Sequence, residues 1–196
     1  MPYFSTIVIV LAVVILAAMM TPSKQVKTEP FQVDKAEWLF DMYLSVLGKN
    51  EEDLTEAERD SIWDKACNRC AMFLTWALMR GHGGEIHLKQ EPDAVEAVRK
   101  REITGTEFFI KYCDCVLSRE DFSDSILPFV DAYYFSRYLE EYDTIALLKR
   151  KTGQPEWGST FSWEEFAVIE KTLDKAYRNW KFYERPIRIG KKRISS

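Results

Sequence analysis

The sequence predicts a mainly α-helical protein, in which a single globular multi-helix domain follows an N-terminal membrane helix. Three observations support this prediction. Residues 3–20 are almost entirely apolar, and apolar residues in the remainder recur at three- to four-residue spacing. A Thr or Ser precedes a Glu by three positions at three places, which is the pattern of a helix capping box. Period-two alternation, typical of half-exposed strands, is scarce.

The apolar segment from Tyr3 to Met20 carries no charge. A spanning helix needs about 20 mainly apolar residues, so this segment is just long enough. A secretory signal peptide would begin with basic residues and end at a small-x-small cleavage site, and neither pattern is clear here. We therefore expect residues 1–22 to form an uncleaved transmembrane anchor, with a cleaved signal-like segment or a buried core helix as alternatives, and residues 23–30 to form a linker.

Lysines at 24, 27 and 35 follow the apolar segment, and no basic residue precedes it. The positive-inside bias then favours a single-pass protein of the bacterial inner membrane with its domain in the cytoplasm. A periplasmic domain is the alternative.

The domain expected over residues 31–184 divides into helices at its capping and breaking signals. Asp34 predicts the N-cap of the first helix, and Thr55 with Glu58 begins a long second helix that ends before a glycine-rich turn. Short strands are expected, if anywhere, at residues 85–88 and 185–189. The expected helices cover residues 34–47, 55–80, 92–101, 104–116, 123–151 (with a bend near Pro128) and 162–180.

The formal net charge of −4 conceals an uneven distribution. Residues 185–196 form a basic tail without acidic residues, so the domain itself carries a charge of roughly −10. Such a field repels nucleic acid and speeds the association of basic proteins. A merely soluble acidic surface is the alternative.

Cysteine and histidine patterns offer weak metal-site candidates. Cys67 and Cys70 form a C-x-x-C, and Cys113 and Cys115 form a C-x-C, but the first pair falls on the apolar side of a helix. We expect reduced cysteines packed in the core, with disulfides or a zinc site as alternatives. The two histidines lie in or beside the glycine-rich turn at residues 81–84, where we expect ordinary surface residues.

Two acidic runs are the candidate partner-binding residues. Acidic side chains interleaved with tyrosines suit a protein interface, because tyrosine supplies rigid contact area. An ordinary amphipathic helix is the alternative for the second run. The first run comprises Glu51, Glu52, Asp53 and Glu56, and the second comprises Tyr138, Glu140, Glu141, Tyr142 and Asp143.

Five blocks of the sequence resemble a bacterial domain family of unknown biochemical function, whose members are small, acidic and rich in tryptophan. Typical members carry His in place of Arg69 and Gly in place of Ala71, and they lack a membrane segment. Such genes resemble, in size and setting, the immunity proteins of polymorphic and secreted bacterial toxins. The blocks are Asp-Lys-Ala-Glu-Trp at 34–38, the helix with Met-Phe-Leu-Thr-Trp at 66–76, Thr-Gly-Thr-Glu-Phe-Phe leading to Cys-Asp at 104–114, Phe-Val-Asp-Ala-Tyr-Tyr to Glu-Glu-Tyr at 129–142, and Phe-Ser-Trp-Glu-Glu-Phe to Trp-Lys at 161–181.

The resemblance implies no catalytic residues, and the chain lacks a P-loop and a nucleophile-elbow motif. We therefore expect a membrane-tethered immunity protein, not an enzyme, that neutralises a basic toxin without a metal, a cofactor, nucleic acid or a small-molecule substrate. The alternative is an adaptor or structural component of an envelope or secretion complex. A third hypothesis is a metal-dependent enzyme that uses His82, Glu85 and His87.

Overall fold

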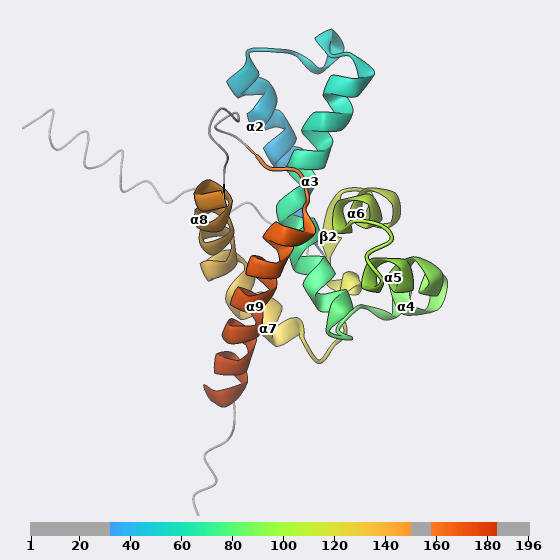
Figure 1. Ribbon diagram of the computed structural model, residues 1–196, viewed down its shortest axis with the longest axis vertical. Helices are drawn as coiled ribbons and strands as arrows, with labels where there is room; N and C mark the ends of the chain where they lie inside the picture. The colour runs from blue at the N-terminus through green and yellow to red at the C-terminus, as the bar shows by residue number, and fades with distance from the viewer. Residues whose placement is uncertain (1–31, 150–157, 184–196) are drawn as a thin grey trace, which may run out of the picture. The chain divides into compact units, whose positions relative to one another are not determined.

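The computed structural model describes residues 32–149 and 158–183 (Figure 1). The predicted anchor at 1–22, the linker at 23–30 and the basic tail with its possible strand at 185–189 lie outside the described residues. The described part is mainly helical, as predicted, and no helix in it is both long and apolar enough to cross a membrane. Its elements are β1 (Gln32–Lys35), α2 (Glu37–Leu47), the 3-10 helix η1 (Glu51–Asp53), α3 (Glu56–Met79), α4 (Glu85–Gln90), α5 (Pro92–Arg99), α6 (Gly105–Cys113), β2 (Val116–Ser118), the 3-10 helix η2 (Arg119–Asp121), α7 (Leu127–Tyr133), the π-helix η3 (Tyr134–Tyr138), α8 (Leu139–Lys149) and α9 (Trp163–Tyr183).

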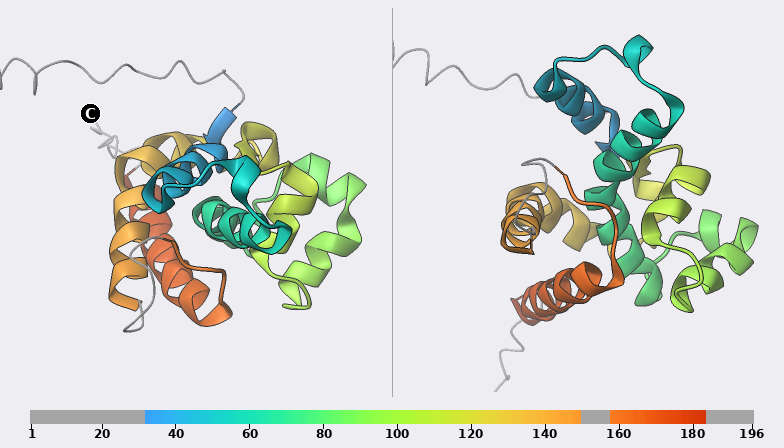
Figure 2. Two further views of the ribbon diagram at one scale, coloured as in Figure 1. Left: turned by 90° about the horizontal axis from the view of Figure 1, so that it is seen from above. Right: turned by 45° about the horizontal axis from the view of Figure 1, so that its top comes forward.

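Helix α3 runs through the centre of the domain (Figure 2). It begins with the predicted capping box, in which the Thr55 hydroxyl accepts from the backbone N–H of Glu58 and the Glu58 carboxylate accepts from Thr55. Every residue from Cys70 to Leu78 is buried, so the second half of the helix is covered on all sides. Helices α2, α5, α6 and α9 all contact it. The burial of this half therefore extends beyond the apolar side that the sequence indicates.

Two short strands that the sequence did not reveal form an antiparallel pair, β1 with β2. A bulge between Gln32 and Asp34 turns both Val33 and Asp34 into the protein interior. The predicted role of Asp34 as a helix N-cap is therefore wrong. Ala36 occupies the cap position of α2, and Asp34 is a fully buried member of the strand.

The segment at 85–88, proposed as a strand, is the short helix α4. Gly84 is its N-cap, and the backbone N–H of Gly84 donates to the carbonyl of Asp121 at 2.8 Å. A Cβ on Gly84 would lie 1.7 Å from the carbonyl oxygen of Glu120, so only glycine permits this approach. The glycine-rich turn thus fixes where α4 begins.

The helix predicted over residues 123–151 is three segments: α7, η3 and α8. Pro128 does not bend this helix. It lies in the first turn of α7, where its missing N–H costs nothing. The irregularity lies further along, in the π-helical turn of η3, which carries the buried side chains of Tyr134 and Tyr138.

Candidate functional site

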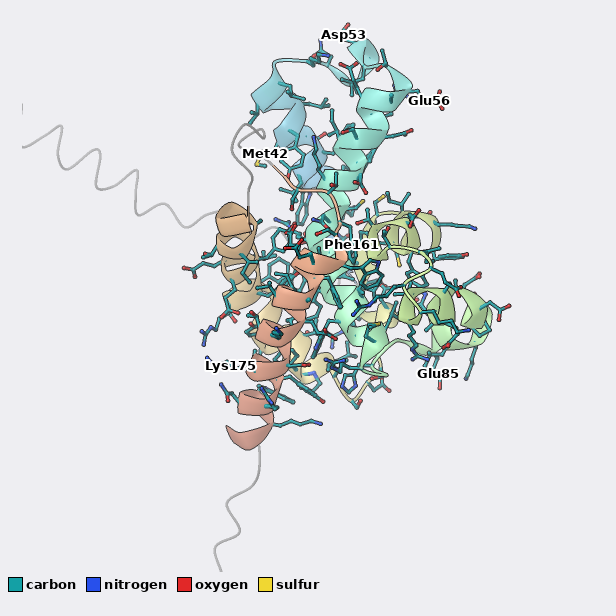
Figure 3. All side chains as sticks on the ribbon, in the orientation of Figure 1. Met42, Asp53, Glu56, Glu85, Phe161 and Lys175 are labelled. Atoms are coloured by element: carbon teal, nitrogen blue, oxygen red, sulfur yellow. The ribbon has the colours of Figure 1, made fainter. Side chains whose placement is uncertain are left out.

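The first acidic run lies at the tip between α2 and α3, where Glu51, Glu52, Asp53 and Glu56 are all exposed (Figure 3). Glu51 lies 3.5 Å from Arg59. Among the described residues, no lysine or arginine lies within ion-pair distance of the other three acids. The tip therefore presents carboxylates whose charge the described part of the domain does not neutralise.

Helix α2 leads into this tip and carries an exposed apolar stripe. Trp38, Met42 and Val46 follow one another at four-residue spacing and therefore share a face of the helix. Their exposed fractions are 39, 45 and 62%. The opposite face is in the core, where Phe40 stacks on Trp63 with ring centroids 4.2 Å apart. We call Trp38, Met42 and Val46 together with the acids Glu51, Glu52, Asp53 and Glu56 the tip surface.

The second acidic run behaves differently, because its tyrosines and its acids face opposite ways. Glu140 and Asp143 are exposed. Tyr138 is buried and donates its hydroxyl to the carbonyl of Arg69 at 2.6 Å. Tyr142 is buried as well. The expectation that these tyrosines offer contact area to a partner is therefore corrected: Tyr138, at the end of the π-helix η3, and Tyr142, in α8, are core residues.

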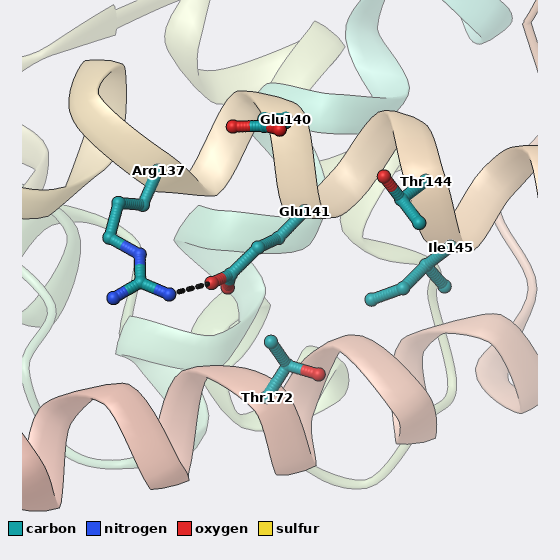
Figure 4. A pocket seen from close by; sticks show the side chains of 6 residues that line it. All are labelled: Arg137, Glu140, Glu141, Thr144, Ile145 and Thr172. Carbon is teal, nitrogen blue, oxygen red and sulfur yellow. Dashed lines mark hydrogen bonds and ion pairs between the residues drawn. The ribbon is translucent and has the colours of Figure 1, made fainter.

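Glu141 lies half-buried in a shallow groove between α8 and α9 (Figure 4). Its carboxylate accepts from Arg137 Nη2 at 3.1 Å and from the hydroxyl of Tyr133. Burial, followed by the hydrogen bond to this carboxylate, raises the pKa of Tyr133, so its hydroxyl stays protonated and donates. Because these contacts already satisfy Glu141, only Glu140 and Asp143 of this run remain available to a partner.

A buried polar network lies beneath these surfaces and centres on the carboxylate of Asp34. Arg69 Nη2 lies 2.9 Å from Asp34 Oδ2, and the hydroxyl of Tyr134 donates to the same oxygen at 2.8 Å. The thiol of Cys70 lies 3.5 Å from it. The network joins β1, α3 and η3.

The four cysteines form no disulfide among the described residues, and the predicted core position holds for Cys67 and Cys70, whereas Cys113 and Cys115 are half-buried. Cys67 and Cys70 are fully buried in α3. Cys113 ends α6, and the next two residues, Asp114 and Cys115, have left-handed backbone conformations with φ of 48° and 58°. These two residues reverse the chain into β2.

The histidines depart from the prediction of plain surface residues. His82 is half-buried, whereas His87 is 2% exposed and its Nε2 lies 2.9 Å from Asp121 Oδ1. Glu85 points into solvent and pairs with Lys89. The turn therefore does not bring His82, Glu85 and His87 together as a site. Sequence reasoning could not find the partner of His87, because the two residues are 34 positions apart.

His87, Cys113 and Asp121 form the one group of potential metal ligands found in the described part of the chain. Their ligand atoms all lie within 4.8 Å of one another.

Comparison with known proteins gives one match. The family model described as a domain of unknown function, DUF7832, matches residues 32–154. No curated protein and no solved structure matches the chain. The matched range begins at β1 and continues past α8. It therefore includes the tip surface, the polar network around Asp34 and the group of His87, Cys113 and Asp121, but not α9.

Proposed function

This chain belongs to the DUF7832 family of domains of unknown function, and we propose that it is an immunity protein, which binds a cognate antibacterial toxin and neutralises it. The observation that carries the proposal is the tip surface, where exposed carboxylates follow an exposed apolar helix face. In protein interfaces, apolar side chains supply buried contact area and charged side chains supply charge complementarity.

The two halves of the tip surface would contribute differently to binding. Trp38 supplies a large, stiff side chain, and residues of this type dominate the energy of interfaces when a partner pocket encloses them. The carboxylates of Glu52, Asp53 and Glu56 would mainly set the association rate and select a partner of opposite charge. We therefore propose a basic toxin.

A toxin that acts on nucleic acid fits this charge best. The active site of such an enzyme attracts phosphate groups through positive side chains, and carboxylates compete for the same side chains. Inhibition would then follow from occupation of the substrate site. The immunity protein itself would need no catalytic residue, metal or cofactor for this role.

We further propose that residues 3–20 tether the domain to the inner membrane, with the domain facing the cytoplasm. The apolar sequence and the lysines that follow it support this orientation. A reporter fused after Ser196 tests it, because a reporter active only in the cytoplasm should then be active. Activity of a periplasmic reporter instead would reverse the orientation and favour a toxin that acts on the cell envelope.

Co-expression with a neighbouring gene, as the candidate toxin, tests the function. Cells that express the toxin should grow only when this protein is present, and the double variant Glu52→Lys/Glu56→Lys should protect them less. The matched control is Asp93→Lys/Glu102→Lys. The two pairs are matched in exposure and position. Glu56 and Asp93 lie in the first turn of an α-helix, whereas Glu52 and Glu102 lie outside the α-helices, and all four are exposed.

Failure of the neighbouring gene product to harm cells or to bind would refute the immunity role. The alternative function, an adaptor of an envelope or secretion complex, would then predict that a resident component of that complex co-purifies with the full-length chain and that the tip variant loses it.

A further inference from the structure

Three side chains of different chemistry converge at a buried point between α4, α6 and η2. His87 Nε2 lies 2.9 Å from Asp121 Oδ1 and 3.8 Å from Cys113 Sγ. His87 and Asp121 are buried, and Cys113 is half-buried. An imidazole nitrogen, a thiol sulfur and a carboxylate oxygen thus face one another.

The surrounding backbone holds these groups in place. Two backbone hydrogen bonds join the residues on either side of Gly83 to the segment after β2. Gly84 N–H donates to the carbonyl of Asp121 at 2.8 Å, and Ser123 N–H donates to the carbonyl of His82 at 2.9 Å. One turn further into α4, His87 lies over Asp121. This placement does not depend on the side chains of the cluster.

Asp121 is oriented by a second contact. Its Oδ2 accepts from the backbone N–H of Ser118 at 2.6 Å, which leaves Oδ1 directed at His87. Metal-binding carboxylates are commonly held in this way by a hydrogen bond to the oxygen that does not face the metal.

The geometry disfavours a cysteine nucleophile activated by a histidine. In such a triad, one ring nitrogen takes the thiol proton while the other is held by the carboxylate. Here the same atom, His87 Nε2, faces both Asp121 and Cys113. A nitrogen already engaged by Asp121 cannot also serve as the base for Cys113. Convergence of three donors on one point is instead the arrangement of metal ligands.

We propose that His87, Cys113 and Asp121 bind one zinc(II) ion. Zinc accepts a thiolate sulfur, an imidazole nitrogen and a carboxylate oxygen as ligands, at about 2.0–2.2 Å from nitrogen and oxygen and about 2.3 Å from sulfur. Tetrahedral angles then require the nitrogen and sulfur to be about 3.6 Å apart and the nitrogen and oxygen about 3.3 Å apart. The separations in the protein, 3.8 and 2.9 Å, differ from these values by a few tenths of an ångström.

Zinc binding has a defined chemical balance. Cys113 binds as the thiolate and its proton passes to water. His87 binds through unprotonated Nε2, so the ring proton that faces Asp121 moves by way of water to Nδ1. A water molecule supplies the fourth ligand, because the three protein ligands leave one tetrahedral position open. The ion ties α4, α6 and η2 together, so it stabilises the folded protein whether or not a partner is bound. This proposal does not depend on the proposed immunity role.

Zinc titration of the full-length chain, purified in detergent and stripped with a chelator, tests the proposal. We expect one zinc per chain and a rise in the thermal unfolding midpoint on zinc addition. Cobalt(II) in place of zinc should give a near-ultraviolet thiolate-to-cobalt absorption band. Cys113→Ser should abolish this band, and His87→Asn and Asp121→Asn should each weaken zinc binding by about tenfold or more.

The chain supplies matched controls for two of these variants. Cys115→Ser changes the other cysteine of the C-x-C, and His82→Asn changes the other histidine. Both should keep the affinity and the absorption band of the unaltered chain, while circular dichroism of each metal-free variant verifies folding. The proposal is overturned if the unaltered chain binds no stoichiometric zinc, or if folded Cys113→Ser and Cys115→Ser proteins bind it equally.

Discussion

Removal of the Asp34 carboxylate should destabilise the domain far more than removal of a surface charge. In the folded protein Asp34 is fully buried, and the side chain of Arg69 beside it is only 14% exposed. Asp34→Ala leaves that guanidinium with little access to water and takes the acceptor from the hydroxyl of Tyr134. Breaking a buried ion pair from one side costs about 3–5 kcal/mol, so we expect a loss in this range.

Urea unfolding followed by tryptophan fluorescence measures this loss. Asp34→Asn keeps the shape and one acceptor oxygen, and it should cost less than Asp34→Ala. Adding Arg69→Met to Asp34→Ala should restore part of the stability, because no uncompensated charge then remains. The control Glu85→Ala breaks an exposed pair with Lys89 and should change stability by less than about 0.5 kcal/mol. A loss below about 1 kcal/mol for Asp34→Ala would refute the reasoning.

Three further predictions concern particular contacts. Tyr142→Phe removes the acceptor of a 3.0 Å hydrogen bond from Asn68 and should cost about 0.5–1.5 kcal/mol of unfolding free energy without altering partner binding. The hydrogen bond from Lys49, followed by those from the backbone and hydroxyl at the helix N-cap, lowers the pKa of Glu58 from 4.5 to about 2. Since the folded-state pKa is the lower one, the contribution of the ionised Glu58 carboxylate to stability is complete above about pH 4.5 and is lost as the pH falls towards 2. Glu58→Gln should therefore flatten that part of a plot of unfolding free energy against pH. An unchanged plot would contradict the assignment. Gly84→Ala places a Cβ 1.7 Å from a backbone carbonyl oxygen and should lower the free energy of unfolding in urea by about 1–3 kcal/mol. It should also weaken zinc binding, because α4 must move. Unchanged stability and zinc affinity would show that the close approach is not required.

Local signals in the sequence predict much of the helical framework. The capping boxes at Thr55 and Thr104 begin α3 and α6, and Pro92 opens α5. These signals suffice because a cap is satisfied within four residues of the chain and needs no distant partner. The exposure of the acids at 51–53 is likewise a local property of a short charged turn.

The remaining features depend on contacts between distant residues, which one sequence does not reveal. Asp34 precedes a helical pattern as an N-cap would, yet its carboxylate is satisfied by Arg69. Tyr138 is adjacent to acids in sequence but faces the core because its helix packs against α3. His87 acquires Asp121 only when the glycine-rich turn packs against η2. In each case tertiary packing decides the role of a polar side chain.

The most direct test of the central claim is calorimetric titration of the neighbouring gene product into the purified full-length chain. The proposed function predicts salt-dependent binding that Glu52→Lys/Glu56→Lys weakens by about tenfold or more, equivalent to about 1.4 kcal/mol, while Asp93→Lys/Glu102→Lys leaves it unchanged. Equal binding by the two variants would contradict recognition through the tip surface, and absence of binding by the unaltered chain would contradict the immunity role itself.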